Sequence, residues 1–183
     1  MKNSVPDRKI YKLPQFENSV KVLYHGRVCE EKGIVALSKE WHRVDSKAIL
    51  YVVGSGENII GERILQFGFR TDVRDIVNQC DICIVPSLAR ESGGPLSLIE
   101  AMAAGKPVVA SDNGSQPEYM RDGIDGFLCH AGNWDVWVDT INKLVRNKTL
   151  REQMGRCGRE YYEKELGFQQ FVGSIENIYE KII

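Results

Sequence analysis

The stretch Arg90–Gly105 (RESGGPLSLIEAMAAG) combines two carboxylates with a glycine-rich loop. Glu91 precedes the glycines at 93 and 94, whose missing Cβ lets backbone N–H groups approach a ligand closely. Pro95 suits the first turn of a following helix, and the N-terminus of such a helix attracts anions. Glu100 lies on the second turn, so the two glutamates can contact two parts of one ligand. An ordinary strand–loop–helix connection with an exposed glutamate at each end is the alternative that this stretch alone leaves open.

Two cations follow an apolar run at residues 20–25. Arg27 comes directly after Gly26 at the end of that run, and Lys32 lies five residues further on, near the start of the next helical pattern. Two cations in this arrangement can converge on a diphosphate with a helix dipole behind them. Surface pairing with the neighbouring Glu30 and Glu31 is the alternative, because exposed charges are the default.

Short apolar runs alternate with helical patterns along most of the chain. The apolar runs predict strands at 20–25, 48–53, 64–69, 81–85, 106–111 and 127–129. Helical patterns occupy 34–44, 71–79, 96–104 and 117–121, and a weaker one occupies 57–63. Thr71 is the expected N-cap of the helix at 71–79. A longer helical region covers 134–183, with interruptions near Asn147 and Gly167. This order predicts an α/β fold, a single doubly wound Rossmann-like domain with a parallel sheet of about six strands.

Parallel sheets of this kind bind ligands outside the carboxyl ends of their strands. The loops at those ends are rich in glycines and cations: Gly26-Arg27, Gly54-Ser55-Gly56, Phe69-Arg70, Ser87–Gly94 and Asp112–Ser115. We therefore expect the glycines, Arg27, Arg70, Arg90 and Glu91 to share one rim, where the cations neutralise phosphate.

Composition argues against several classes of partner. The 183 residues carry a formal net charge of −1 with acidic and basic residues mixed throughout, which is not typical of a nucleic-acid-binding protein. No apolar run reaches the ~18–20 residues of a spanning helix, and the first 20 residues lack the apolar core of a signal peptide. We expect a cytoplasmic protein, with peripheral attachment at the inner membrane face left open.

The histidines and cysteines predict no metal site and no cofactor. His25, His42 and His130 have no ligand-like spacing with acids or cysteines, and no D-x-D motif of metal-dependent transferases is found. The five cysteines are odd in number and lie mostly among apolar residues, which is typical of reduced thiols. Cys80 and Cys83 form a C-x-x-C pair, for which packing is a better explanation than metal or redox chemistry.

Several of these segments together resemble a known family. They are YHGRVCEEKG, AILYVVGSGE, LQFGFRTDV, CDICIVPSLARESGGPLSLIEAMAAGKPVVASD and PEYMRDGIDGFLC. Their order and spacing resemble the nucleotide-binding C-terminal half of retaining glycosyltransferases with the GT-B fold, in the group called family 4 or "glycosyl transferases group 1". The resemblance covers about Val20 to Leu150. It implies a linker or arm at 1–19 and a nucleotide-sugar donor-binding domain at 20–183.

The resemblance also implies roles for individual residues. Arg27 and Lys32 would hold the donor diphosphate, Glu91 would contact the hydroxyls of the donor sugar, and Glu100 would bind the ribose hydroxyls. Glu91, Arg27 and Lys32 would form the catalytic set, and the loop at Phe69-Arg70 would lie against the base. The full implied donor site is Gly26, Arg27, Lys32, Gly54, Phe69, Arg70, Glu91, Ser92, Gly93, Gly94, Pro95, Leu96 and Glu100.

This sequence departs from the family in two respects. Eight residues separate Glu91 from Glu100, one more than is usual in the family, so the loop bulges or Glu91 is displaced. Family members are about twice as long and carry an N-terminal acceptor-binding domain, which would have to be supplied in cis or in trans. The segment Phe168–Ile183 resembles the helix that packs back towards that domain.

The implied activity is retaining, metal-independent transfer of a sugar from a UDP-, GDP- or ADP-linked donor to a hydroxyl acceptor. Clamping the diphosphate between cations makes it a good leaving group without a metal ion. Two alternatives remain open: a non-catalytic nucleotide-sugar-binding partner domain and a GT-B-fold nucleotide-sugar epimerase.

Overall fold

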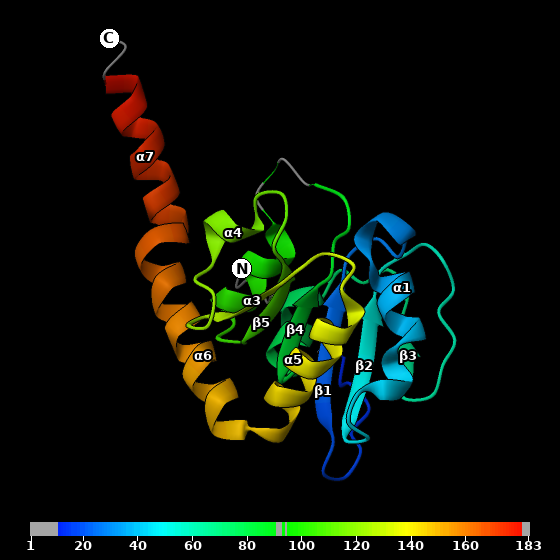
Figure 1. The fold of residues 1–183 in the computed structure, drawn as a ribbon. Helices are drawn as coiled ribbons and strands as arrows, with labels where there is room; N and C mark the ends of the chain where they lie inside the picture. Colours follow the sequence, from blue (N-terminus) through cyan, green and yellow to red (C-terminus); the bar gives the residue numbers. More distant parts are fainter. Residues whose placement is uncertain (1–10, 91–92, 94, 181–183) are drawn as a thin grey trace, which may run out of the picture.

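A computed structural model describes residues 11–90, 93 and 95–180 of the chain (Figure 1). Its centre is one six-stranded sheet with the order β3-β2-β1-β4-β5-β6, in which all neighbouring strands are parallel. The strands are β1 (Val20–His25), β2 (Ala48–Val53), β3 (Ile64–Gln66), β4 (Ile82–Val85), β5 (Val108–Ser111) and β6 (Gly126–Cys129). The predicted doubly wound α/β fold with about six parallel strands is therefore confirmed.

Helices connect and cover these strands. They are α1 (Ile34–Lys39), α2 (Val73–Asn78), α3 (Leu96–Ala103), α4 (Gln116–Tyr119), α5 (Trp134–Arg146), α6 (Lys148–Tyr161) and α7 (Phe168–Glu180). Short 3₁₀ segments occupy Glu30–Lys32 and Trp41–Arg43, and a π-helical segment occupies Tyr162–Leu166. The predicted breaks at Asn147 and Gly167 coincide with the ends of α5 and the start of α7. Helix α7 projects from the body of the domain (Figure 1).

The four inner strands, β1, β2, β4 and β5, are buried on both faces, which explains why their sequences are continuous apolar runs. Val22 and Tyr24 of β1 pack into a core cluster that includes residues of α1 and α5, such as Ile34 and Ile141. Leu23, which points to the opposite face, belongs to a second cluster with residues of α2 and α3. An apolar cluster thus covers each face of the sheet, and the loops at the strand ends are where functional groups can lie.

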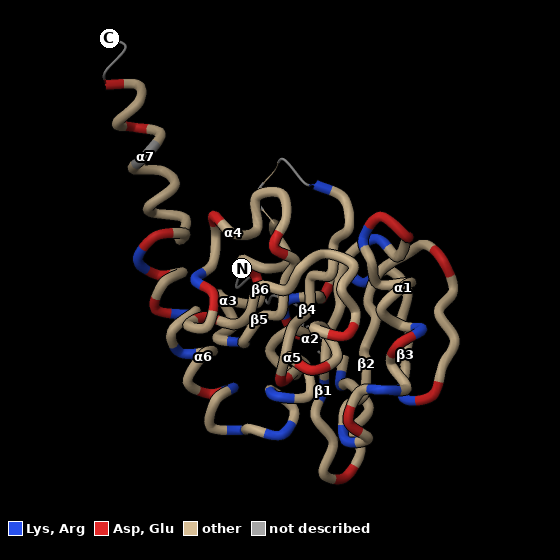
Figure 2. Tube along the Cα trace, viewed as in Figure 1, with Lys and Arg blue, Asp and Glu red and all other residues tan. Residues whose placement is uncertain are grey.

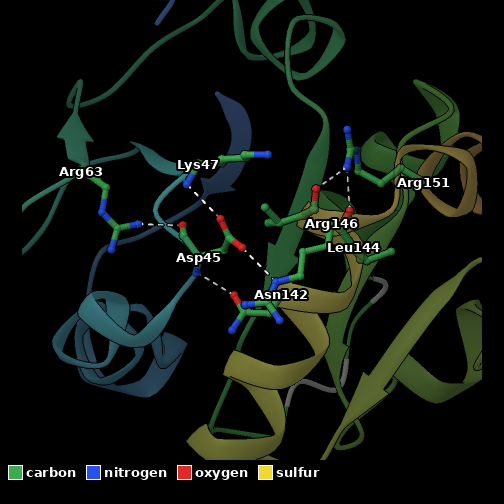
Figure 3. A network of polar contacts seen from close by, with 8 residues as sticks. Asp45, Lys47, Arg63, Asn142, Leu144, Arg146 and Arg151 are labelled. Atoms are coloured by element: carbon green, nitrogen blue, oxygen red, sulfur yellow. Dashed lines mark hydrogen bonds and ion pairs between the residues drawn. The ribbon is translucent and has the colours of Figure 1, made fainter. Parts of the chain in front are cut away.

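A polar network ties the entrance of β2 to helix α5, at the end of the sheet away from the carboxyl ends of the strands (Figure 3). The backbone N–H of Asp45 donates to Asn142 Oδ1 over 2.7 Å, and Arg146 Nε donates to Asp45 Oδ2 over 2.9 Å. Arg63 Nη1 donates to the carbonyl oxygens of Asp45 and Ala48 over 2.9 and 3.1 Å. The hydrogen bond from Arg146 lowers the pKa of Asp45.

Two predicted helices differ from the structure. The prediction of a weak helix at 57–63 was wrong, because this segment forms no helix. The side chain of Gln66 hydrogen-bonds its backbone instead: Oε1 accepts from Ile59 N–H over 2.8 Å, and Nε2 donates to Glu57 O over 2.9 Å. The predicted helix at 34–44 divides into α1 and the 3₁₀ turn at Trp41–Arg43. The strand predicted at 64–69 ends at Gln66, shortly before Gly68, whose φ is +65°.

The first described residues lie against the domain. Leu13 is buried in the second apolar cluster, and its backbone N–H donates to Gln79 Oε1 over 3.0 Å. Tyr51 Oη donates to the carbonyl oxygen of Pro14 over 2.7 Å. Tyr11 packs edge-on against Phe67, with ring centroids 5.9 Å apart. These contacts place the segment 11–14 beside β2, the residue that follows β3 and the C-terminal end of α2.

Candidate functional site

A cleft of about 640 Å³ opens at the carboxyl ends of β1 and β2. The loops after β1, β2 and β3 and the helices α2 and α3 contribute its lining: His25, Gly26, Arg27, Val53, Gly54, Ser55, Phe69, Arg70, Thr71, Val73, Arg74 and Glu100. The cleft lies beside the place where the strand order turns back, because the chain runs from β1 outward to β3 and then returns to β4 on the other side of β1. Crevices at such switch points are the usual ligand sites of open α/β sheets.

Glycine is required at the ends of β1 and β2. Gly54 has a φ of +148°, and a Cβ there would lie 1.8 Å from the carbonyl oxygen of Gly26. This close backbone contact is a packing reason for Gly54, independent of any ligand. Gly54 and Gly26 together keep the floor of the cleft free of side chains.

The structure brings Arg27 and Lys32 to neighbouring hollows. Arg27 is exposed and lines the main cleft, and within the described part of the chain its guanidinium has no ion pair. Lys32 lines a small pocket of about 40 Å³ that shares His25 and Gly26 with the main cleft. Glu30, one of the two glutamates considered as surface partners, pairs with Lys39 at 3.7 Å. The Arg27 charge is thus available to an anion in the cleft.

Arg70 also lines the cleft, but its charge is engaged. Its Nε and Nη2 atoms donate to the two carboxylate oxygens of Asp72 over 2.9 and 2.8 Å, and its guanidinium lies 4.3 Å from the ring centroid of Tyr11. The hydrogen bonds from Arg70 lower the pKa of Asp72. The predicted Thr71 N-cap was wrong: Asp72 is the N-cap residue of α2, and it binds Arg70 instead of capping the helix. Phe69 stands exposed at the cleft.

Glu100 projects from α3 into the same cleft between two basic side chains. Its Oε2 lies 3.7 Å from His25 Nδ1, and its Oε1 lies 3.9 Å from Arg74 Nε. Burial lowers the pKa of His25 to about 4, and the backbone of Ser97 opposes this only in part. The imidazole is therefore neutral at pH 7. Sequence reasoning missed both partners, although a histidine closing an apolar strand was a visible signal.

Other predicted residues lie outside the lining of the main cleft. Leu96 lines a second hollow of about 300 Å³, which shares Arg74 and Glu100 with the cleft. Arg90 lines a separate hollow with Asp112, Asn113 and Gly114, from the loop after β5 that was expected on the same rim, and it does not line the main cleft. Pro95 is buried at the start of α3.

The loop before α3 is only partly described. The carbonyl oxygen of Gly93 accepts a hydrogen bond from Ser115 Oγ over 2.7 Å. Glu91, Ser92 and Gly94 lie outside the described residues, so their predicted contacts with the donor sugar and phosphate stay predictions.

The charge distribution and the cysteines add two observations. Acidic and basic residues are interspersed along the described chain (Figure 2). All five cysteines are free thiols, and burial raises the pKa of Cys80 to about 12. Among the described residues, no group of three or more His, Cys, Asp or Glu side chains is arranged to hold a metal ion. None of the described helices is both long and apolar enough to cross a membrane.

Comparison with known proteins identifies the family. Residues 7–161 match the model of the family described as "Glycosyl transferases group 1", and the chain belongs to this family. N-acetyl-alpha-D-glucosaminyl L-malate synthase of Bacillus anthracis is 29% identical over 161 residues, which cover 82% of this chain and 41% of that protein. The predicted family resemblance is thereby confirmed.

Solved structures of other proteins share the fold. HepE of Anabaena, in complex with UDP and glucose, superposes with a TM-score of 0.78 at 22% identity over 87% of this chain and 49% of its own. Sucrose-phosphate synthase of Thermosynechococcus elongatus gives a TM-score of 0.80 at 22% identity over 90% of this chain and 46% of its own. The fold is therefore that of half a GT-B glycosyltransferase. The chain spans about half, or less, of the length of the relatives it matches.

Proposed function

We propose that this chain is the donor-binding domain of a retaining, metal-independent glycosyltransferase. The whole enzyme would transfer a sugar from a nucleoside diphosphate to a hydroxyl acceptor. In this proposal residues 20–183 form the donor-binding domain, residues 1–19 form the linker or arm that precedes it, and an acceptor-binding domain acts in cis or in trans. The observation that carries the proposal is the cleft at the switch point of the sheet, because Arg27, a cation with no ion pair to another described residue, and a carboxylate, Glu100, line it together.

The two groups suit the two ends of a nucleoside diphosphate. A carboxylate accepts hydrogen bonds from vicinal ribose hydroxyls, and Glu100 has this chemistry. Arg27 and Lys32 line adjacent hollows and supply positive charge for the diphosphate. Phe69 and Arg70 also line the cleft and would contact the base of the nucleotide. That HepE has been solved with UDP and glucose supports UDP as the first nucleotide to test, ahead of GDP and ADP.

The reaction we propose needs no metal ion and no cofactor. Bond cleavage between the sugar and the diphosphate leaves negative charge on the departing oxygen, and Arg27 and Lys32 stabilise that charge. Glu91 orients the donor sugar, and departure and attack on the same face retain the stereochemistry. Because positioning the acceptor contributes much of the rate, the isolated chain turns over slowly or not at all.

We also propose a reducing compartment, the cytoplasm. Five free thiols, three of them buried, are typical of proteins that are not exposed to an oxidising environment.

Calorimetric titration of the purified chain with UDP, GDP, ADP and their sugar conjugates tests the proposal. We expect selective binding of one nucleotide, weakened in Glu100→Ala and unchanged in Glu160→Ala, a matched control on α6. Wild-type chain that binds none of them would contradict the proposal. Conversion of a nucleotide sugar to another configuration without an acceptor would favour the epimerase alternative, and stoichiometric binding to a separate acceptor-domain chain without turnover would favour the partner-domain alternative.

A further inference from the structure

His25 occupies the place where the main cleft and the small pocket meet. It is the last residue of β1, it lines both hollows, and only 8% of it is exposed. Its Nε2 atom is buried without a hydrogen-bond partner among the described residues. Buried polar atoms are nearly always paired, so this nitrogen calls for a functional explanation.

The other ring nitrogen faces Glu100. His25 Nδ1 lies 3.7 Å from Glu100 Oε2, slightly beyond hydrogen-bond range. A movement of about half an ångström would close this gap, and hydrogen bonds in ligand sites are often long until the ligand binds. Arg74, on the other side of Glu100, is 89% exposed in its side chain, so water screens its interaction with the carboxylate. The buried imidazole is the better fixed of the two.

The charge state of the ring decides what it can do. A buried imidazole that stays neutral has one N–H donor and one acceptor nitrogen. If Nδ1 carries the hydrogen, it can donate to the carboxylate, with the backbone of Ser97 as the competing acceptor, and it leaves the negative charge of Glu100 intact for the ligand. Nε2 is then an acceptor for a hydroxyl or a water molecule that arrives with the ligand.

We propose that His25 is a positioning residue for Glu100, and that its Nδ1–H holds the carboxylate in the orientation that binds ribose hydroxyls. The inference rests on the proposed function, since it assigns a second residue to the ribose end of the nucleotide site. A positioning role predicts that loss of the imidazole lowers discrimination at the ribose more than it lowers affinity for the diphosphate.

The test compares ribonucleotides with their 2′-deoxy counterparts. Dissociation constants are measured for UDP, GDP and ADP and for the 2′-deoxy form of each, with the wild-type chain, His25→Phe and His25→Asn. Phenylalanine keeps the ring shape without nitrogens, and asparagine places an amide donor near the position of Nδ1. For the nucleotide that binds best, we expect wild type to prefer the ribo form by about tenfold or more, the range for a hydrogen bond to a charged group.

His25→Phe should reduce this preference to about twofold or less, and His25→Asn should restore most of it. His42→Phe, at an exposed histidine outside the cleft, should leave it unchanged. An undiminished ribose preference in folded His25→Phe would overturn the inference and leave the proposed function standing. Wild type that binds no nucleotide would overturn the proposed function and this inference together.

A second measurement needs no variant. Nitrogen-15 NMR of the wild-type chain with the nucleotide bound reports which ring nitrogen of His25 carries the hydrogen. We expect the Nδ1–H form. An Nε2–H form would overturn the inference, because Nδ1 would then have no hydrogen to donate to Glu100.

Discussion

Gly54 lies against the backbone of Gly26 so closely that a Cβ on Gly54 would come within 1.8 Å of the Gly26 carbonyl oxygen. This contact joins the loops that leave β1 and β2, and both glycines line the cleft. The shape of the site therefore depends on a packing requirement between two strand ends, and the residues that carry charge are placed around it.

Gly54→Ala tests this dependence. The substitution adds a steric clash and places a side chain at a φ of +148°, so we expect a loss of about 2–4 kcal/mol in the free energy of unfolding and weaker nucleotide binding. Gly123→Ala is the matched control, because Gly123 has a φ of +73° but nothing within 4 Å of its Cβ position. It should cost only about 1–2 kcal/mol and leave binding intact. Equal losses in the two variants, measured by urea unfolding, would contradict the packing argument.

Arg27 and Arg70 line the same cleft but differ in their partners. Arg27→Ala should weaken nucleoside diphosphate binding by about 1.5–3 kcal/mol, because an available cation is lost. Arg70→Ala should weaken it by less than about 1 kcal/mol, since the Arg70 charge is already compensated by Asp72. Calorimetric titration of both variants measures the difference. If Arg70→Ala were the more damaging change, the diphosphate would have been assigned to the wrong arginine.

The buried His25 makes stability depend on pH. Unfolded His25 takes up a proton near its ordinary pKa of 6.5, whereas in the folded chain burial lowers the pKa to about 4. Between these values the unfolded state binds more protons, so the free energy of unfolding falls as the pH drops from about 6.5 to about 4, by roughly 3 kcal/mol in all. Below that interval the effect levels off.

Urea unfolding at a series of pH values measures this dependence. The loss between pH 6.5 and 4 should be much smaller in His25→Phe and should persist in His42→Phe. The carboxyls of Asp45 and Asp72, whose pKa values are lowered by hydrogen bonds from arginines, lose their stabilising effect only at still lower pH. The same slope in His25→Phe as in wild type would show that another group is responsible.

Arg63 is expected to matter for stability and not for binding. Its guanidinium donates to the carbonyl oxygens of Asp45, Ala48 and Trp41, at the end of the sheet away from the cleft. Arg63→Ala removes these three hydrogen bonds from a charged donor and should lower the free energy of unfolding by about 2 kcal/mol, although the Asp45 and Trp41 oxygens still accept from backbone N–H groups. Arg156→Ala, at an exposed arginine on α6, should change it by less than about 0.5 kcal/mol. A loss of nucleotide affinity in folded Arg63→Ala would contradict the separation of scaffold and site.

The sequence predicted the strands best, because residues buried on both faces of a parallel sheet form unbroken apolar runs. The predicted bounds of β1 and β2 coincide with those of the structure. The segment 57–63 was less predictable, since its backbone is satisfied by the distant side chain of Gln66 and not by local helical bonds. Such a tertiary hydrogen bond leaves no periodic signal in a sequence.

The sequence predicted those parts of the site that lie directly at the ends of strands. Arg27, Gly54 and Arg70 were expected at the carboxyl edge of the sheet, Glu100 was expected on the helix that follows the loop, and all four line the cleft. The pairing of Arg70 with Asp72 and the approach of His25 to Glu100 depend on side-chain directions, which spacing does not give. Arg90 lies beside the loop after β5, in a hollow separate from the cleft, and spacing does not predict this separation either.

The donor site is tested most directly by the affinity of the wild-type chain for UDP, GDP and ADP, measured by calorimetry in buffer containing EDTA. We expect micromolar binding of one of the three, with the same dissociation constant after addition of magnesium, because protein cations neutralise the diphosphate. Binding that appears only with magnesium would contradict the metal-independent site. Absence of binding under both conditions would contradict the assignment of the cleft itself.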